Sequence, residues 1–142
     1  MTSDLELAAR FDYDFLEIPA IVINTENAQA ITSKEDYVQG DLSVQNSDFD
    51  MDATSMKIKG RGNSTWGMPK KPYKVKFDKK QSMFGSSYKA KTWTLLANYS
   101  DKSLSRNYIA YEMSKQMDGI AFSSAHIFVD LYLNGEYEGV YL

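Results

Sequence analysis

The residues best suited to chemistry lie in one stretch, GRGNSTWGMPKKPYKVKF, which spans residues 60–77. It combines three glycines and two prolines with five basic side chains. Backbone N–H groups of a glycine-rich turn, together with nearby cations, are donors that bind phosphate. A tight turn between two strands, each with one solvated face, needs the same residue types. The stretch therefore has two interpretations, a phosphate-binding loop and a structural turn.

Two phosphate-binding motifs fail on specific residues. A P-loop requires Lys and then Ser or Thr after its second glycine, but Met68 and Pro69 follow Gly67 here. A dinucleotide-binding turn requires a third glycine where this sequence has Thr65. Such a turn also leads into a helix, whereas a strand is predicted to follow here. The layout that remains is that of protein kinases, in which a glycine-rich loop precedes a strand lysine and a helix glutamate.

The kinase layout assigns roles to residues in three elements. The loop is 60–67, the strand lysine is Lys74 or Lys76, and the helix glutamate that would fix its direction is Glu112. A strand lysine and a helix glutamate also occur together in most α+β domains. The pattern by itself therefore favours a structural turn beside a solvated sheet face.

Charge is strongly segregated along the chain. The 142 residues carry a net charge of −3, yet residues 57–80 hold nine basic side chains and one acidic. Residues 1–56 hold two basic and twelve acidic side chains. The local positive field of residues 57–80 attracts an anion, whether a phosphate, an acidic protein or the acidic first third of this chain.

Composition excludes several classes of site. The sequence has no cysteine, so it forms no disulfide, thiolate nucleophile or cysteine-ligated zinc site. Its one histidine, His126, argues against a histidine-based metal site or a Ser/His pair. No apolar run is long enough to span a membrane.

Alternating apolar residues predict strands at 20–26, 41–45, 55–62, 72–78 and 91–98. In the third and fourth of these, Lys57 and Lys59 oppose the apolar face, as do Lys74 and Lys76. If the two strands are neighbours, the lysines form one cationic face. The aspartate-rich segment 48–55 lacks the glycine and glutamate of a calcium loop and is predicted as a solvated loop.

One helix is predicted over 103–117, with Ser100, Asp101 or Ser103 as its cap. The last segment, 126–142, contains Asn134-Gly135, a strong hairpin signal. These elements together predict an α+β fold, a mostly antiparallel sheet with the helix packed on it.

Four motifs carry a resemblance to a known family: IKGRGNSTW, KKPYKVKFD, WTLLANYSDKSLSRNYIAYEM and VDLYLNGEYEGVYL. In this order, over about residues 56–142, they resemble the CotH (spore coat protein H) kinase-like family. The segment IPAIVINTENAQAITSKEDYV resembles the strand region that usually precedes them. The resemblance implies that residues 19–142 form the N-lobe of a reduced atypical protein kinase. Residues 1–18 are then an acidic arm or short helix.

The resemblance also implies a chemistry, the transfer of phosphate from ATP to serine in proteins, with Mg²⁺ or another divalent cation. It assigns nucleotide binding to six residues: Arg61, Asn63, Ser64, Lys74, Lys76 and Glu112. The catalytic and metal-binding aspartates of the family lie in a second half that has no counterpart here. We therefore expect residues 1–142 alone to be inactive. Family members occur at spore or cell surfaces or in secreted proteins.

A second interpretation is a non-catalytic binding or adhesion module. Its ten tyrosines and its basic face would then contact a surface protein or an acidic glycan. Nucleic acid fits less well, because the chain is acidic overall and carries no nucleic-acid-binding signature. The apolar segment 139–142 is expected to be an exposed edge through which two copies self-associate.

Overall fold

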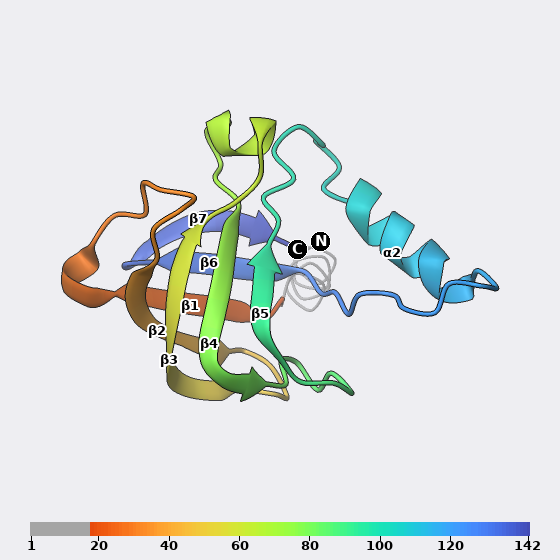
Figure 1. Cartoon of the computed structure of the whole chain (residues 1–142), viewed down its shortest axis with the longest axis horizontal. Coiled ribbons are helices and arrows are strands. Elements are labelled where there is room, and N and C mark those ends of the chain that lie inside the picture. The colour runs from red at the N-terminus through yellow and green to blue at the C-terminus, as the bar shows by residue number, and fades with distance from the viewer. Residues whose placement is uncertain (1–17) are drawn as a thin grey trace, which may run out of the picture.

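Residues 18–142 are described by a computed structural model, in which they form one mixed seven-stranded sheet of order β5-β4-β3-β2-β1-β6-β7 (Figure 1). The N-terminal segment 1–18, predicted to be an acidic arm or short helix, lies outside these residues, apart from Ile18. Neighbouring strands are antiparallel, except that β1 and β6 are parallel. The strands are β1 (Ala20–Thr25), β2 (Val38–Gln45), β3 (Met51–Gly60), β4 (Tyr73–Gln81), β5 (Ala90–Leu95), β6 (Val129–Leu133) and β7 (Glu136–Tyr141).

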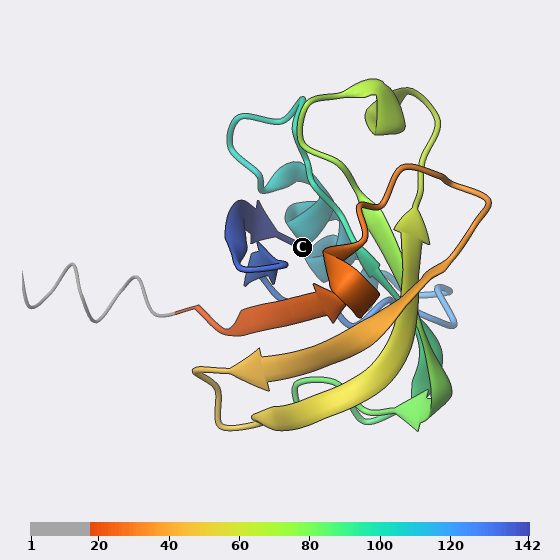
Figure 2. The same cartoon turned by 90° about the vertical axis from the view of Figure 1, so that its left-hand side faces the viewer.

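The sheet curls until its two edges meet, as the side view shows (Figure 2). Just beyond β5 and β7, Leu96 and Leu142 exchange two backbone hydrogen bonds of 2.8 and 3.1 Å. The apolar face of the curled sheet points inward, where Tyr73 and Tyr141 stack with ring centroids 6.3 Å apart. Strands from the two sides of the curl therefore bury each other's side chains.

The single α-helix of the described residues, α2 (Arg106–Gln116), does not cover this sheet. None of its residues is buried, and the apolar core contains no residue between Ala97 and Val129. The predicted α+β layer, with a kinase-like helix packed on the sheet, was therefore wrong. Figure 1 shows α2 projecting to the side within a long excursion, residues 98–128, which we call the arm. Within residues 18–142, no helix is long and apolar enough to cross a membrane.

Two physical features explain this correction. The curled sheet fills its own inner face, so no helix is needed to cover it. The apolar side chains of α2 also lie in two sectors, because Tyr108 and Tyr111 face the segment 126–128 while Ile109 and Met113 point to solvent. The helix thus lacks one dominant apolar stripe.

Strand pairing was predicted more accurately. Strands β3 and β4 are neighbours, and Lys57 lies opposite Lys76 while Lys59 lies opposite Lys74. The predicted cationic face of the sheet is therefore confirmed. The hairpin is confirmed too, because β6 and β7 pair around Asn134 and Gly135, whose φ angles are 51° and 83°.

Two local predictions were wrong. Strand β3 already begins at Met51, inside the predicted aspartate-rich loop 48–55, because β2 and β3 are joined by a tight turn. The segment 139–142 is not an exposed apolar edge either, since Tyr141 and Leu142 are buried and Leu142 pairs with Leu96. Self-association itself stays a prediction.

Candidate functional site

The glycine-rich turn between β3 and β4 is built around a tryptophan. A Cβ atom on Gly60 would lie 2.3 Å from the indole of Trp66, so only glycine leaves room for that ring. Gly62 has a φ of 86°, which a side chain would strain. Trp66 also packs edge-on against Tyr73, with ring centroids 6.5 Å apart. Two of the three glycines therefore have structural reasons to be glycine.

Three lysine side chains hold the glycine-rich turn in place. Lys34 Nζ donates to the Gly62 carbonyl at 3.0 Å, and Lys71 Nζ donates to the Trp66 carbonyl at 2.7 Å. Lys70 Nζ donates to the carbonyl of Val140 and lies 4.5 Å from the centroid of the Tyr141 ring. Burial lowers the pKa of Lys70. Lys34 and Lys70 thus link the turn to the region before β2 and to β7, whereas the Lys71 bond lies within the turn.

A polar pocket of about 300 Å³ opens between this turn and the start of the arm. Three cations line it, Arg61 and Lys70 from the turn and Arg106 from the first position of α2. Amide and hydroxyl groups complete the lining, from Thr65, Asn98, Ser100 and Asn107. We call this the cationic pocket, and its volume falls at the lower end of known ligand sites.

Asp101 is the single carboxylate of the cationic pocket, and it accepts hydrogen bonds at the start of α2. Its Oδ2 accepts from the backbone N–H of Arg106 at 2.9 Å, and its Oδ1 accepts from the Ser103 hydroxyl at 2.7 Å. The Arg106 N–H bond, with those from Ser103, holds the pKa of Asp101 below its usual value. Asn107 Nδ2 donates to Asn98 Oδ1 at 2.7 Å and fixes α2 to the preceding loop.

Glu112 belongs to a different set of contacts. Lys115 Nζ donates to its Oε1 at 2.8 Å, and this bond, with the nearby His126, lowers the pKa of Glu112. His126 Nε2 lies 2.6 Å from the same Oε1, without hydrogen-bond geometry, while its Nδ1 lies 2.9 Å from the Ser124 carbonyl.

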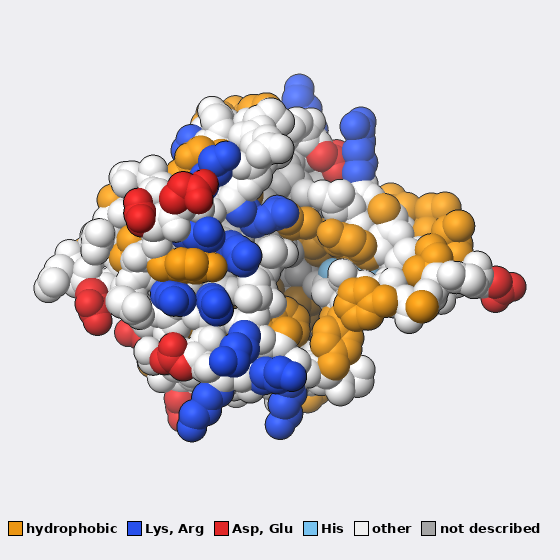
Figure 3. Space-filling view, viewed as in Figure 1, with side chains coloured by type: hydrophobic (Ala, Val, Ile, Leu, Met, Phe, Trp, Pro, Cys, Tyr) orange, Lys and Arg blue, Asp and Glu red, His pale blue; other side chains and the backbone are white. Residues whose placement is uncertain are grey.

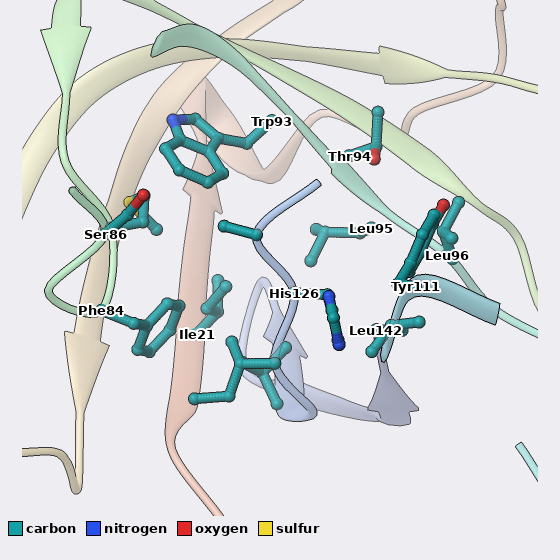
Figure 4. Close-up of a pocket in the computed structure, with 14 residues that line it drawn as sticks. Ile21, Phe84, Ser86, Trp93, Thr94, Leu95, Leu96, Tyr111, His126 and Leu142 are labelled. Carbon is teal, nitrogen blue, oxygen red and sulfur yellow. The ribbon is translucent and has the colours of Figure 1, made fainter. Parts of the chain in front are cut away.

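A second, largely apolar pocket of about 200 Å³ lies between β5 and the arm. Figure 4 shows Trp93 and Phe84 on one side, and Tyr111, His126 and Leu142 on the other. It shares one wall residue, Leu96, with the cationic pocket. The apolar pocket is where the inner face of β5 meets the inward side of the arm.

The six residues predicted to bind nucleotide fall in three places. Arg61 lines the cationic pocket, and Asn63 and Ser64 are exposed on the same turn. Lys74 and Lys76 lie on the outer face of β4, on the side away from the core. Glu112 lies on the arm, beside Lys115 and His126. The structure thus does not bring Glu112 to Lys74, and the nucleotide-binding roles stay predictions.

Sequence reasoning did not assign Lys70, Asn98, Arg106 or Asn107 to a ligand site, although all four line the cationic pocket. Lys70 was treated as part of a turn, and Arg106 and Asn107 were interpreted as part of a network that holds the start of the helix. Only the fold brings the turn and the loop at 96–101 together. Within residues 18–142, no group of three or more histidine or acidic side chains is placed to hold a metal ion.

Comparison with known proteins agrees with the motifs. A family model described as CotH kinase protein matches residues 58–142, which is more than half of the chain. The matched region begins in β3 and includes both the glycine-rich turn and the arm. A search of curated proteins found no match.

Proposed function

The chain belongs to the CotH kinase protein family, and we propose that its residues 58–142 form the nucleotide-binding part of a protein kinase that transfers phosphate from ATP to serine. The family match supports a kinase-like relationship. The identity of the nucleotide, the acceptor residue and the binding site are our proposal. One observation carries it, the cationic pocket between the glycine-rich turn and the start of α2.

The lining of the cationic pocket suits a chain of phosphates. Arg61 and Arg106 present planar guanidinium groups that match phosphate oxygens, and Lys70 adds an ammonium group. Asn98 and Asn107 add amide groups at the same opening. The one carboxylate, Asp101, already accepts hydrogen bonds from Arg106 and Ser103, so it adds little repulsion toward an anion.

This proposal revises which residues hold phosphate. Arg61 keeps its role, with Asn63 and Ser64 at the rim of the turn. Arg106 and Lys70 take the place that the sequence assigned to Lys74 and Lys76, whose side chains are on the outer face of the sheet.

The cationic pocket offers no free carboxylate to bind the divalent cation of a kinase. Asp101 is the single carboxylate in the cationic pocket, and both of its oxygens are engaged with Arg106 and Ser103. Within residues 18–142 the donors present therefore do not fit a Mg²⁺ site, and the ion would enter with the nucleotide phosphates.

Calorimetric titration of Mg·ATP into the chain tests the proposal. Arg61→Ala should weaken binding about tenfold or more, because a charged donor to phosphate is lost. Lys74→Ala and the exposed control Lys102→Ala should leave the affinity within about twofold. Inorganic tripolyphosphate should compete with Mg·ATP.

Two results would overturn the assignment. An unmeasurable affinity for Mg·ATP and tripolyphosphate would remove the pocket as a phosphate site. Loss of binding in Lys74→Ala with retention in Arg61→Ala would move the site to the outer face of the sheet.

A second function, the non-catalytic binding module, is favoured by a different observation. Most of the large apolar side chains that the described residues expose lie on the arm, and Figure 3 shows them gathered there. Such exposed apolar surface is typical of a protein contact. A chain that binds no nucleotide but retains this surface would fit that function.

A further inference from the structure

A compact group of four lysines covers the outer side of β3 and β4. Lys57 and Lys59 extend from β3, and Lys76 and Lys74 lie directly opposite them on β4. We call these four the lysine face, and Figure 3 shows Lys and Arg side chains gathered over these strands. None of the four lines the cationic pocket, so the inference below does not depend on nucleotide binding.

The lysine face is not neutralised within the described chain. Like charges directly opposite each other on neighbouring strands are destabilising. The ion pairs among residues 18–142 join Asp101, Glu112 and their partners on the arm, and none includes a lysine of the face. Within residues 18–142, none of the four lysines is therefore ion-paired.

The geometry of the face is that of two adjacent extended strands. Lysines two residues apart on one strand are separated by about 6.6 Å, and those on opposite strands by about 5 Å. A peptide in extended conformation repeats its side chains on one face with the same separation of about 6.6 Å. Two acidic residues at alternate positions of such a peptide would each meet one opposed pair of lysines.

The chemistry of the face favours carboxylates over phosphates. All four cations are lysines, which bind as point charges, whereas phosphate and nucleic-acid recognition favours the planar fork of arginine. Lys57 Nζ and Lys59 Nζ also lie 4.9 and 4.8 Å from the ring centroid of Tyr37. This ring gives the face an apolar patch against which an intervening side chain of a peptide can pack.

The overall charge argues for a short acidic segment over a long polyanion. The whole chain has a net charge of −3, and residues 1–56 carry twelve acidic side chains. Charges are screened beyond about 8–10 Å in physiological salt, so a short ligand responds mainly to the lysines beside it. A nucleic acid would extend past the face and meet the acidic remainder of the protein.

From this register, charge and chemistry we propose that the lysine face docks an extended segment of a partner polypeptide with acidic residues at alternate positions. The contact is electrostatic, with the peptide lying along β3 and β4 and two of its carboxylates each accepting from one opposed pair, Lys57 with Lys76 or Lys59 with Lys74. Such a segment would be held on the outer side of the sheet, away from both pockets.

The test uses the full chain and a fluorescent peptide of about eight residues, threonine except for two glutamates at alternate positions, which place two carboxylates on one face. Fluorescence anisotropy should report binding at about 20 mM salt that weakens strongly at about 200 mM. The double variant Lys57→Gln, Lys76→Gln removes one opposed pair and should weaken binding about tenfold or more. The matched double variant Lys89→Gln, Lys102→Gln removes two exposed charges elsewhere and should change it less than about twofold.

A second peptide tests the spacing. It has the same composition, with its two glutamates adjacent, so only one of them faces the lysines when the peptide is extended. We expect it to bind more weakly than the alternating peptide. Thermal unfolding controls for folding, because loss of like-charge repulsion should leave the midpoint of the Lys57, Lys76 variant unchanged or raised.

Three results would each overturn the proposal. Equal weakening by both double variants would show general attraction to a basic region. Tighter binding of a single-stranded polyuridylate of equal charge would assign the face to nucleic acid. Displacement of the peptide by Mg·ATP, lost in Lys74→Ala, would assign it to nucleotide.

Discussion

The curled sheet and the arm differ in what they bury, although the arm is no less apolar than the chain as a whole. Every core residue after position 90 lies in or beside β5, β6 and β7, and none lies between Ala97 and Val129. The arm instead exposes Ile109, Met113 and Phe122. Apolar composition therefore does not decide burial here. Strand pairing does, because the sheet closes through Leu96 and Leu142 and the core lies inside that closure.

The largest effect is expected from a cavity in the sheet. Phe77 is 1% exposed and faces the core from β4, so Phe77→Ala should lower the free energy of unfolding by about 3–5 kcal/mol. Urea denaturation followed by circular dichroism measures this. A loss below about 1 kcal/mol would show that the sheet interior is as loosely packed as the arm.

The glycine-rich turn should behave as part of the sheet. In Gly60→Ala the new methyl group would overlap the Trp66 indole at 2.3 Å, so the ring must move, at a cost of about 1–3 kcal/mol. Gly67→Ala is the matched control, because a Cβ there meets nothing within 4 Å. Tryptophan fluorescence and thermal unfolding would register the displacement. Equal behaviour of the two variants would mean that Trp66 does not hold the turn.

The sheet interior should also respond to alkali. Burial, and secondarily Glu138, raise the pKa of Tyr73 from 10.0 to about 12. The folded state thus favours the neutral phenol, whose stabilising effect is complete below pH 10.0 and is lost as pH rises toward about 12.

Tyr73→Phe should remove about 1–2 kcal/mol of this alkaline loss, after allowance for solvent screening. Urea midpoints measured at pH values between neutral and strongly alkaline would show it. An identical pH dependence in Tyr73→Phe would contradict the raised pKa of Tyr73. Tyr137→Phe is a useful comparison, because the pKa of Tyr137 is raised mainly by its hydrogen bond to Asp130 on the exposed hairpin.

The contrast between sheet and arm also separates the features that the sequence predicted from those that it did not. Alternation predicted which face of β3 and of β4 carries lysines, and Asn134-Gly135 located the hairpin. These features depend on neighbours within a short stretch. Even here Asn134 has a role that no local pattern indicated, since its Oδ1 accepts from the Thr25 backbone N–H at 2.8 Å and joins β6 to β1.

The closure of the sheet and the position of the arm were not predictable in the same way. Leu96 and Leu142 lie far apart in sequence, and nothing in either segment indicates that they pair. Because closure was not anticipated, α2 was expected to cover an open sheet. The cationic pocket was missed for the same reason, since it joins the turn at 60–70 to the start of the arm.

The arm should lose structure locally on acidification. Hydrogen bonds from Arg106 N–H and from Ser103 lower the pKa of Asp101, so their stabilising effect is present above the ordinary value of 3.8 and is lost as pH falls through the lowered pKa. Asp101→Asn should reduce the helical circular dichroism signal at neutral pH while the unfolding midpoint of the sheet stays unchanged. A midpoint that falls together with the helical signal would mean that arm and sheet unfold as one unit.

The smallest effect on stability is expected on the exposed side of α2. A large effect there would contradict the contrast between the sheet and the arm. Met113 is 59% exposed, and glutamine has a similar helix propensity, so Met113→Gln should change the free energy of unfolding by less than about 0.5 kcal/mol. The same urea titration used for Phe77→Ala measures it, which makes the two variants a matched pair. Binding of a fluorescent apolar dye should fall in Met113→Gln, because part of the exposed surface is removed. A stability loss approaching that of Phe77→Ala would show that Met113 is buried in solution, and the arm would then have to be packed against the sheet or against a second copy of the chain.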